Sequence, residues 1–172
     1  MQKIYSKILI LAVLTGIFSC APDDKFEDVP YLEWDEAEFI EEEDTTSNRW
    51  YVKVSLYFTD GDGDVGFEQN VQDTGACDTN NYDLFLRYFE QVDGTFVEQF
   101  PDDPCQPFHN ALPYLTPEGQ NKTLEGYIKS PFDYSGFPKN NTDSIKFEVY
   151  ITDRAGHSSN VVSSPSIFVP EL

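Results

Sequence analysis

In the body of the chain, hydrophobic residues recur at every second position in short segments that turn-forming residues separate. In an extended chain, one face of residues 51–58 would carry the side chains of Val52, Val54, Leu56 and Phe58. Residues 144–153 show the pattern most regularly, with Ile145, Phe147, Val149 and Ile151 in phase. Because successive side chains of a strand point to opposite faces, this period of two predicts half-buried β-strands.

Further segments of this kind cover residues 82–91, 122–129 and 159–169. Asp93-Gly94 predicts a hairpin turn, and Pro165 limits the last segment to a sheet edge or a bulge. Six or seven strands separated by turns predict one all-β domain over residues 49–172, an antiparallel sandwich of about seven strands. The body lacks a sustained helical period; upstream of it, residues 34–43 fit either a short helical stretch or an extended edge strand.

The first 19 residues have the layout of a secretory signal peptide, with a short basic region followed by the apolar residues 8–18. This apolar run is shorter than the roughly 18 to 20 residues that span a bilayer. Residues 17–20, Ile-Phe-Ser-Cys, resemble the lipobox of bacterial lipoproteins, which implies cleavage before Cys20 and a lipid anchor of several acyl chains on that cysteine. The alternative is an ordinary cleaved signal followed by a chance cysteine.

Three cysteines are an awkward number for a secreted protein. If lipid occupies Cys20, then Cys77 and Cys105 are left as one pair, and an oxidising compartment favours a disulfide between them. Such a bond would contribute about 3 to 4 kcal/mol on the chain-entropy model. The alternative is two free buried thiols.

Acidic residues dominate the segment that follows Cys20, with twelve carboxylates between residues 23 and 44. We expect an acidic tether over residues 20–48. Asp23 and Asp24 resemble the signal that sends Bacteroidota lipoproteins to the outer face of the outer membrane; the alternative is a solvated tether without an address. Without the signal, 31 acidic and nine basic residues give a net charge of −22, so nucleic acid is a poor partner and cations are good ones.

The stretch FTDGDGDVGFE at residues 58–68 places aspartates at alternating positions among glycines. Carboxylates spaced in this way can converge on one Ca²⁺ ion, which takes six to eight oxygen ligands. The spacing begins like an EF-hand loop, but Val65 and Val71 stand where that loop needs glycine and a bidentate glutamate. The candidate ligands of a different kind of Ca²⁺ loop are Asp60, Asp62, Asp64, Glu68, Asp73 and Asp153. The alternative is a turn built from common turn residues.

The chain resembles a family of uncharacterised Bacteroidota outer-membrane lipoproteins with Ig-like β-sandwich domains. Four segments carry the resemblance in order between Arg49 and Ile167: FTDGDGDVG, YDLFLRYFE, LPYLTPEGQNKTLEGYI and IKFEVYITDRAGHSSNVVSSP. The resemblance implies an Ig-like sandwich and an outer-membrane location, and it implies no activity.

Sequence signatures of common catalytic and cofactor sites are missing. The two histidines, His109 and His157, fit no HExxH pattern, and the chain has no CxxC pair and no GxSxG motif. The GDGDVG segment has no lysine for a phosphate loop, and its aspartates would repel phosphate. We therefore do not expect an enzyme, although 31 acidic residues make chance carboxylate pairs inevitable.

Two functional hypotheses follow from these features. In the first, the protein is a surface-exposed outer-membrane lipoprotein and a non-catalytic accessory or structural subunit, held by its lipid beside an outer-membrane barrel or other lipoproteins. In the second, it is an autonomous surface module that binds glycan, peptide or a host surface with the help of Ca²⁺. Exposed-looking aromatic residues in the loops motivate the second hypothesis, although a core role is the more common one for such residues.

Overall fold

The computed structural model describes residues 26–43, 48–67, 82–102, 108–119, 121–134, 137 and 142–169. The predicted signal peptide, Cys20, Cys77, Cys105, Glu68 and Asp73 lie outside this part of the chain. Within the described ranges, no helix combines the length and the apolar character needed to cross a membrane.

The described residues form an all-β structure of antiparallel strands, as predicted. They contain nine strands, where the sequence predicted about seven. The strands are β1 (Tyr31–Glu43), β2 (Asn48–Asp60), β3 (Leu84–Val92), β4 (Thr95–Gln99), β5 (His109–Asn110), β6 (Leu124–Asp133), β7 (Ser144–Ile151), β8 (Val162–Ser163) and β9 (Ile167–Phe168). The higher count arises from β1, from the short strand β5 and from the division of the last segment into β8 and β9.

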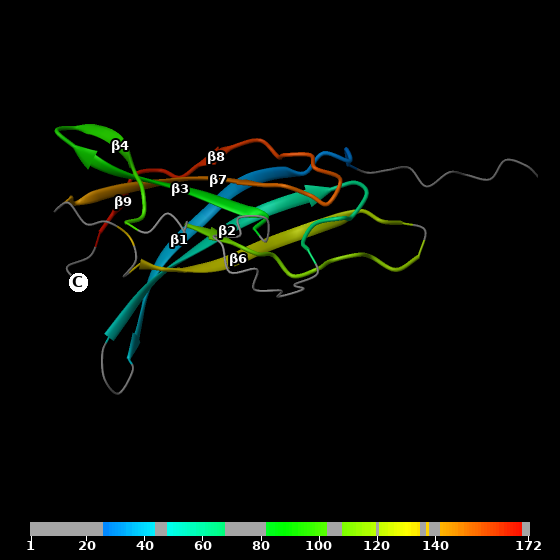
Figure 1. Cartoon of the computed structure of the whole chain (residues 1–172), viewed down its shortest axis with the longest axis horizontal. Helices are drawn as coiled ribbons and strands as arrows, with labels where there is room; N and C mark the ends of the chain where they lie inside the picture. The colour runs from blue at the N-terminus through cyan, green and yellow to red at the C-terminus, as the bar shows by residue number, and fades with distance from the viewer. Residues whose placement is uncertain are drawn as a thin grey trace, which may run out of the picture.

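Two sheets make up a sandwich with Ig-like strand order (Figure 1). One sheet has the order β1-β2-β6, and the other has the order β4-β3-β7-β8, with β5 on β3 and β9 on β7. These orders correspond to A-B-E and C′-C-F-G of an immunoglobulin sandwich. Consecutive strands therefore change sheets three times: between β2 and β3, between β5 and β6, and between β6 and β7.

The core lies between the two sheets and is built from the faces that the alternating pattern predicted. The inward side chains of β2 and β7 are buried: Val52, Val54, Leu56, Phe58, Ile145, Phe147, Val149 and Ile151. Strand β3 adds Leu84, Leu86 and Tyr88, and β6 adds Ile128 and Phe132. Since one buried aliphatic or aromatic side chain contributes roughly 1.5 to 3 kcal/mol, this shared core holds the sheets together.

The turn signals of the sequence are also confirmed. Asp93 and Gly94 both have positive φ, 48° and 80°, and connect β3 to β4. Two consecutive residues with positive φ are typical of the type I′ hairpin turn, whose twist matches that of the flanking strands. Pro165 lies between β8 and β9 and separates them, because proline cannot donate to a sheet ladder.

Strand β1 corrects the predicted domain boundary. The sequence was interpreted as an acidic tether over residues 20–48, but Tyr31–Glu43 pairs with β2 along its whole length, from Tyr31↔Thr59 to Glu43↔Asn48. Leu32 is fully buried in the core, and Trp34 and Phe39 pack against it. The folded domain therefore begins before residue 49, and the extended-strand alternative for residues 34–43 is the correct one.

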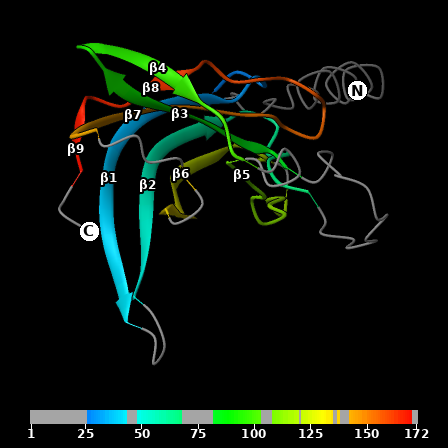
Figure 2. The same cartoon turned by 60° about the vertical axis from the view of Figure 1, so that its left-hand side comes forward.

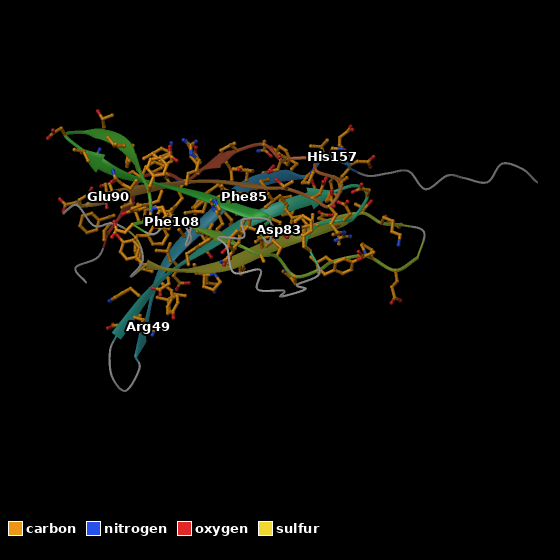
Figure 3. The ribbon with its side chains drawn as sticks, in the orientation of Figure 1. Arg49, Asp83, Phe85, Glu90, Phe108 and His157 are labelled. Atoms are coloured by element: carbon orange, nitrogen blue, oxygen red, sulfur yellow. The ribbon has the colours of Figure 1, made fainter. Side chains whose placement is uncertain are left out.

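The hairpin of β1 and β2 extends beyond the rest of the sandwich (Figures 1 and 2). Arg49 lies near its tip, at the end of the molecule far from His157 (Figure 3). The opposite end of β2 meets the turn after β7, and the sequence-predicted aspartates lie there.

Candidate metal centre

The aspartate loop begins where β2 ends. Asp60 is the last residue of β2, and Asp64 donates its backbone N–H to the Asp60 carboxylate at 2.9 Å. Gly63 has a positive φ of 67°, and a Cβ atom at this position would collide with the backbone oxygen of Lys122. Glycine is therefore required at this position, because it allows the chain to curl tightly beneath the neighbouring loop.

The loop meets a second aspartate-bearing turn from the other sheet. Asp153 follows β7, directly after an isolated bridge between Thr152 and Ser158. The backbone N–H of Arg154 donates to the carbonyl of Asp64 at 3.2 Å, which ties the two turns together. Carboxylate oxygens of Asp60, Asp64 and Asp153 all lie within 4.8 Å of one another. The structure thus brings residues 60 and 153 together at one end of the sandwich, although they are far apart in sequence.

Several oxygens of this cluster are buried and have no hydrogen-bond partner among the described residues. They are Oδ1 of Asp60, of Asp62 and of Asp64. Asp60 as a whole is 0% exposed. An unpaired buried polar atom costs about 1 to 3 kcal/mol, and a charged one costs more. A cation is one kind of partner that would satisfy such oxygens, and a water molecule or a proton is another.

Burial and mutual repulsion also raise the pKa values of Asp60 and Asp62. Burial and, to a smaller extent, the charges of Asp62, Asp64 and Asp153 raise the pKa of Asp60 to about 6, although the hydrogen bond from the backbone of Asp64 acts to lower it. Burial likewise raises the pKa of Asp62, together with the charges of Asp64, Asp28 and Asp153. These directions are those of carboxylates held close together without a compensating positive charge.

Among the described residues, lysine and arginine side chains do not supply that charge. Within the described residues, no lysine or arginine forms an ion pair with Asp60, Asp64 or Asp153. Arg154 is adjacent to Asp153 in sequence, but its guanidinium donates to the carbonyls of Val65, Gly66 and Leu115. It also lies over the ring of Tyr114, 4.3 Å from the centroid.

His157 positions Asp153. Its backbone N–H donates to Oδ1 of Asp153 at 2.7 Å, and its ring Nδ1 lies 3.0 Å from Oδ2. The Asp153 side chain is fully buried, whereas the imidazole is 45% exposed. Figure 3 shows His157 at this end of the sandwich, on the turn after β7. Hydrogen bonds to a ligating carboxylate fix its orientation and are typical of metal sites.

The structure brings together three of the six predicted ligands, Asp60, Asp64 and Asp153. Asp62 lies in the same loop with a buried, unpaired oxygen, but it is not part of the closest group. Glu68 and Asp73 lie outside the described residues. Sequence reasoning missed His157 and Asp28, since neither belongs to the aspartate repeat.

A site of this composition suits a hard cation. All the candidate side-chain ligands are carboxylate oxygens, which suit Ca²⁺ and Mg²⁺ better than softer metals. Backbone carbonyls and water would complete the shell, and Ca²⁺ tolerates such irregular geometry whereas Mg²⁺ demands a near-ideal octahedron. The group that the structure brings together consists of carboxylates, a composition suited to holding a cation.

Fold and site together define an Ig-like β-sandwich with an acidic centre at one end. Comparison with protein-family models, with curated proteins and with solved structures gave no match. The resemblance to Bacteroidota lipoproteins therefore stays a prediction from the sequence.

Proposed function

We propose that this protein is a non-catalytic, calcium-stabilised subunit of an outer-membrane protein complex, displayed on the cell surface by a lipid on Cys20. The single observation that carries the calcium assignment is the set of buried aspartate oxygens without partners at the end of the sandwich. The lipid anchor and the surface location are supported by the sequence of residues 1–24.

The position of the centre supports a stabilising role for the ion. Asp60 ends a strand of one sheet, and Asp153 follows a strand of the other, so one cation would bridge both layers. In the absence of a cation, the same carboxylates repel each other across the layers. Calcium thus turns a repulsive contact between the sheets into an attractive one.

The shape of the molecule supports a role as a subunit. The β1–β2 hairpin extends beyond the rest of the sandwich (Figure 2), and β1 is the outer strand of its sheet. A projecting hairpin can pair along its edge or lie against a neighbouring barrel. The lipid would keep such a contact at a high local concentration in the plane of the membrane.

Calcium binding is tested by thermal unfolding of the full-length protein in detergent, in chelator and in millimolar Ca²⁺. A ligand that binds only the folded state at 100 times its Kd adds about 2.7 kcal/mol, so we expect a rise in Tm of several degrees. Asp60→Asn and Asp64→Asn should abolish most of this rise. Asp143→Asn, which removes an exposed carboxylate outside the cluster, should retain it. An unchanged melting curve of the unmodified protein in millimolar Ca²⁺ contradicts the proposal.

Membership of a complex is tested by affinity purification of the tagged lipoprotein from membranes in mild detergent. A recurring barrel or lipoprotein at fixed stoichiometry supports the subunit, whereas a protein that purifies alone contradicts it.

A second candidate function is an autonomous binding module that uses Ca²⁺ to shape its site. An open groove of about 1030 Å³ beside the aspartate loop favours it. Tyr31 and Tyr57 contribute aromatic surface to this groove, and Glu27, Asp28 and Glu33 contribute carboxylates. Aromatic rings beside hydrogen-bonding groups are suited to stack on sugars. A glycan and peptide panel in the presence of Ca²⁺ tests this candidate, and absence of binding across the panel removes its support.

A further inference from the structure

We propose that the cation at this centre also holds the segment of residues 26–30 against the aspartate loop, so that calcium sets the length of the tether between the lipid anchor and the sandwich. The inference rests on the proposed function, because it takes the lipid on Cys20 and the cation at the centre as given. The inference extends the calcium-dependent part of the molecule to residues 26–30, which lie outside the aspartate repeat.

The segment lies directly on the first residue of the loop. The backbone N–H of Gly61 donates to the carbonyl of Glu27 at 2.8 Å. A Cβ atom on Gly61 would lie 2.5 Å from the backbone oxygen of Phe26 and 2.7 Å from that of Glu27, closer than any real contact. The absence of a side chain at Gly61 is therefore what lets the two backbones meet.

A carboxylate of the segment acts on the centre. Asp28 directly follows Glu27, whose carbonyl accepts the N–H of Gly61 between Asp60 and Asp62, so its carboxylate belongs to the same acidic end of the sandwich. Asp28 itself is exposed, so its contribution is a long-range charge interaction and not a buried contact. Without a cation, Asp28 repels the loop against which its own segment packs, and a divalent cation reverses the sign of this interaction. A cation at the centre would thus add an electrostatic attraction to the backbone hydrogen bond between Gly61 and Glu27.

The next anchor along the chain does not depend on the cation. Leu32 exchanges two hydrogen bonds with the side chain of Asn160, at 2.8 and 2.9 Å, and β1 pairs with β2 from Tyr31 onward. Detachment of residues 26–30 would therefore stop at Tyr31. The buried side chain of Leu32 supports this limit.

Release of residues 26–30 would increase the maximum distance between Cys20 and the sandwich. At roughly 3.3 to 3.6 Å per residue, the chain from Cys20 to Phe26 spans at most about 20 Å, and the chain from Cys20 to Tyr31 spans at most about 40 Å. Calcium would hold the acidic end of the sandwich within the shorter distance of the membrane, and its removal would release the domain to the longer one.

The experiment is amide hydrogen exchange, followed by mass spectrometry, on the full-length lipidated protein in detergent micelles with Ca²⁺ or with chelator. We expect Ca²⁺ to slow exchange at least about tenfold in residues 60–66, which contain the N–H of Gly61 that donates to Glu27, and in residues 153–157. Because residues 26–27 contribute carbonyls to the contact, protection of residues 26–30 is measured by limited proteolysis, and we expect Ca²⁺ to slow cleavage after Glu27 by a glutamate-specific protease at least about tenfold. The turn between β3 and β4, residues 91–96, lies at the opposite end of β3 from Leu84, which pairs beside the centre with Ile151; this turn should exchange equally in both conditions and serves as the internal control.

Two variants separate the segment from the centre. Gly61→Ala places a methyl group against the backbone of residues 26–27, so protection of the segment should be lost while Ca²⁺ still protects residues 153–157. Its matched control is Gly126→Ala on β6, where the added Cβ meets only the Phe58 ring at 3.7 Å and protection should persist.

Asp28→Asn removes one carboxylate charge. It should raise the Ca²⁺ concentration that gives half-maximal protection of residues 60–66, the Ca²⁺ midpoint, about three- to tenfold. Glu38→Gln removes one exposed charge from β1 and should shift the midpoint less than twofold. Equal shifts in the two variants would mean that Asp28 contributes only net charge, and this result would overturn its role.

The outcomes distinguish the two proposals. Protection of residues 60–66 and 153–157 without protection of residues 26–30 overturns the tether inference and leaves the calcium centre intact. The absence of calcium-dependent protection in all three segments, with no rise in Tm, overturns both.

Discussion

At the residue scale, the acidic centre is defined by what its side chains lack. Asp60 ends a strand in the interior, a position where an alternating apolar pattern would place a hydrophobic residue. Its Oδ2 accepts the N–H of Asp64, whereas its Oδ1 has no described partner. A carboxylate held in this way destabilises the fold when it is charged and alone, and stabilises it when a cation is present.

The protonation of Asp60 gives the protein without cation an unusual pH dependence. The folded pKa of about 6 lies above the ordinary value of 3.8, so the folded state binds the proton more tightly than the unfolded state. The resulting stability is complete below pH 4 and is lost as the pH rises through 6. We expect chelated protein to resist urea better at pH 5 than at pH 7, by roughly 1 kcal/mol from this group.

Urea titrations in chelator at the two pH values check this expectation, and Asp60→Asn should flatten the difference. Other carboxylates contribute in the same range, so the comparison between the unmodified protein and the variant is the measured quantity. A wild-type difference that the variant reproduces in full would show that Asp60 is not its source.

At the element scale, the strands that the sequence predicted best are those with an unbroken period of two. Strands β2 and β7 were found from their alternation, and each buries the predicted face. Strand β1 was missed as part of the domain for a definable reason. Its register shifts between Trp34 and Glu36, so the inward positions change from Leu32 and Trp34 to Ala37 and Phe39. This β-bulge interrupts the period, and the acidic residues around it resemble a tether.

The corrected boundary predicts how truncation acts. A chain that begins at residue 49 loses β1, exposes the edge of β2 and leaves the core without Leu32. Loss of one such side chain alone costs about 2 to 5 kcal/mol, and loss of the strand ladder costs more. We expect this chain to be unfolded or insoluble, whereas a chain that begins at residue 26 should unfold cooperatively. Circular dichroism and size-exclusion chromatography of the two chains check this expectation, and a soluble, cooperative chain from residue 49 would contradict the role given to β1.

At the scale of the whole molecule, the fold was more predictable than the site. Many segments of the sequence each show the alternating pattern of a β-strand, so the prediction of a sandwich does not change when one segment is missed. The site depends on a few long-range contacts. The repeat of Asp60, Asp62 and Asp64 marked the loop, but only the sheet topology brings Asp153 beside it. The contact of residues 26–28 with Gly61 has no sequence signal, because it runs through backbone atoms.

The location of the whole molecule is tested through its predicted anchor. Cys20→Ala removes the lipidation site, and a chain that carries a net charge of −22 without its signal is repelled by an anionic bilayer. We expect the variant to leave the membrane fraction, since stable attachment requires the acyl chains. Fractionation and immunoblotting measure this distribution. Continued membrane attachment of the variant would contradict the lipobox assignment, and the unmodified protein provides the control.

The joining of the β2 end to the turn after β7 has a consequence for secretion. A cross-link between residues 60 and 153 encloses most of the folded chain, so it acts on the denatured ensemble as a disulfide does, and it is reversible. A secreted polypeptide has to stay unfolded until it has crossed the inner membrane. Extracellular modules commonly bind calcium with a Kd of about 10⁻⁴ to 10⁻³ M. If the link between residues 60 and 153 forms only when calcium binds with such a Kd, the native state reaches its full stability only where the ion is abundant. The acidic centre would then couple maturation of the chain to its arrival outside the cell.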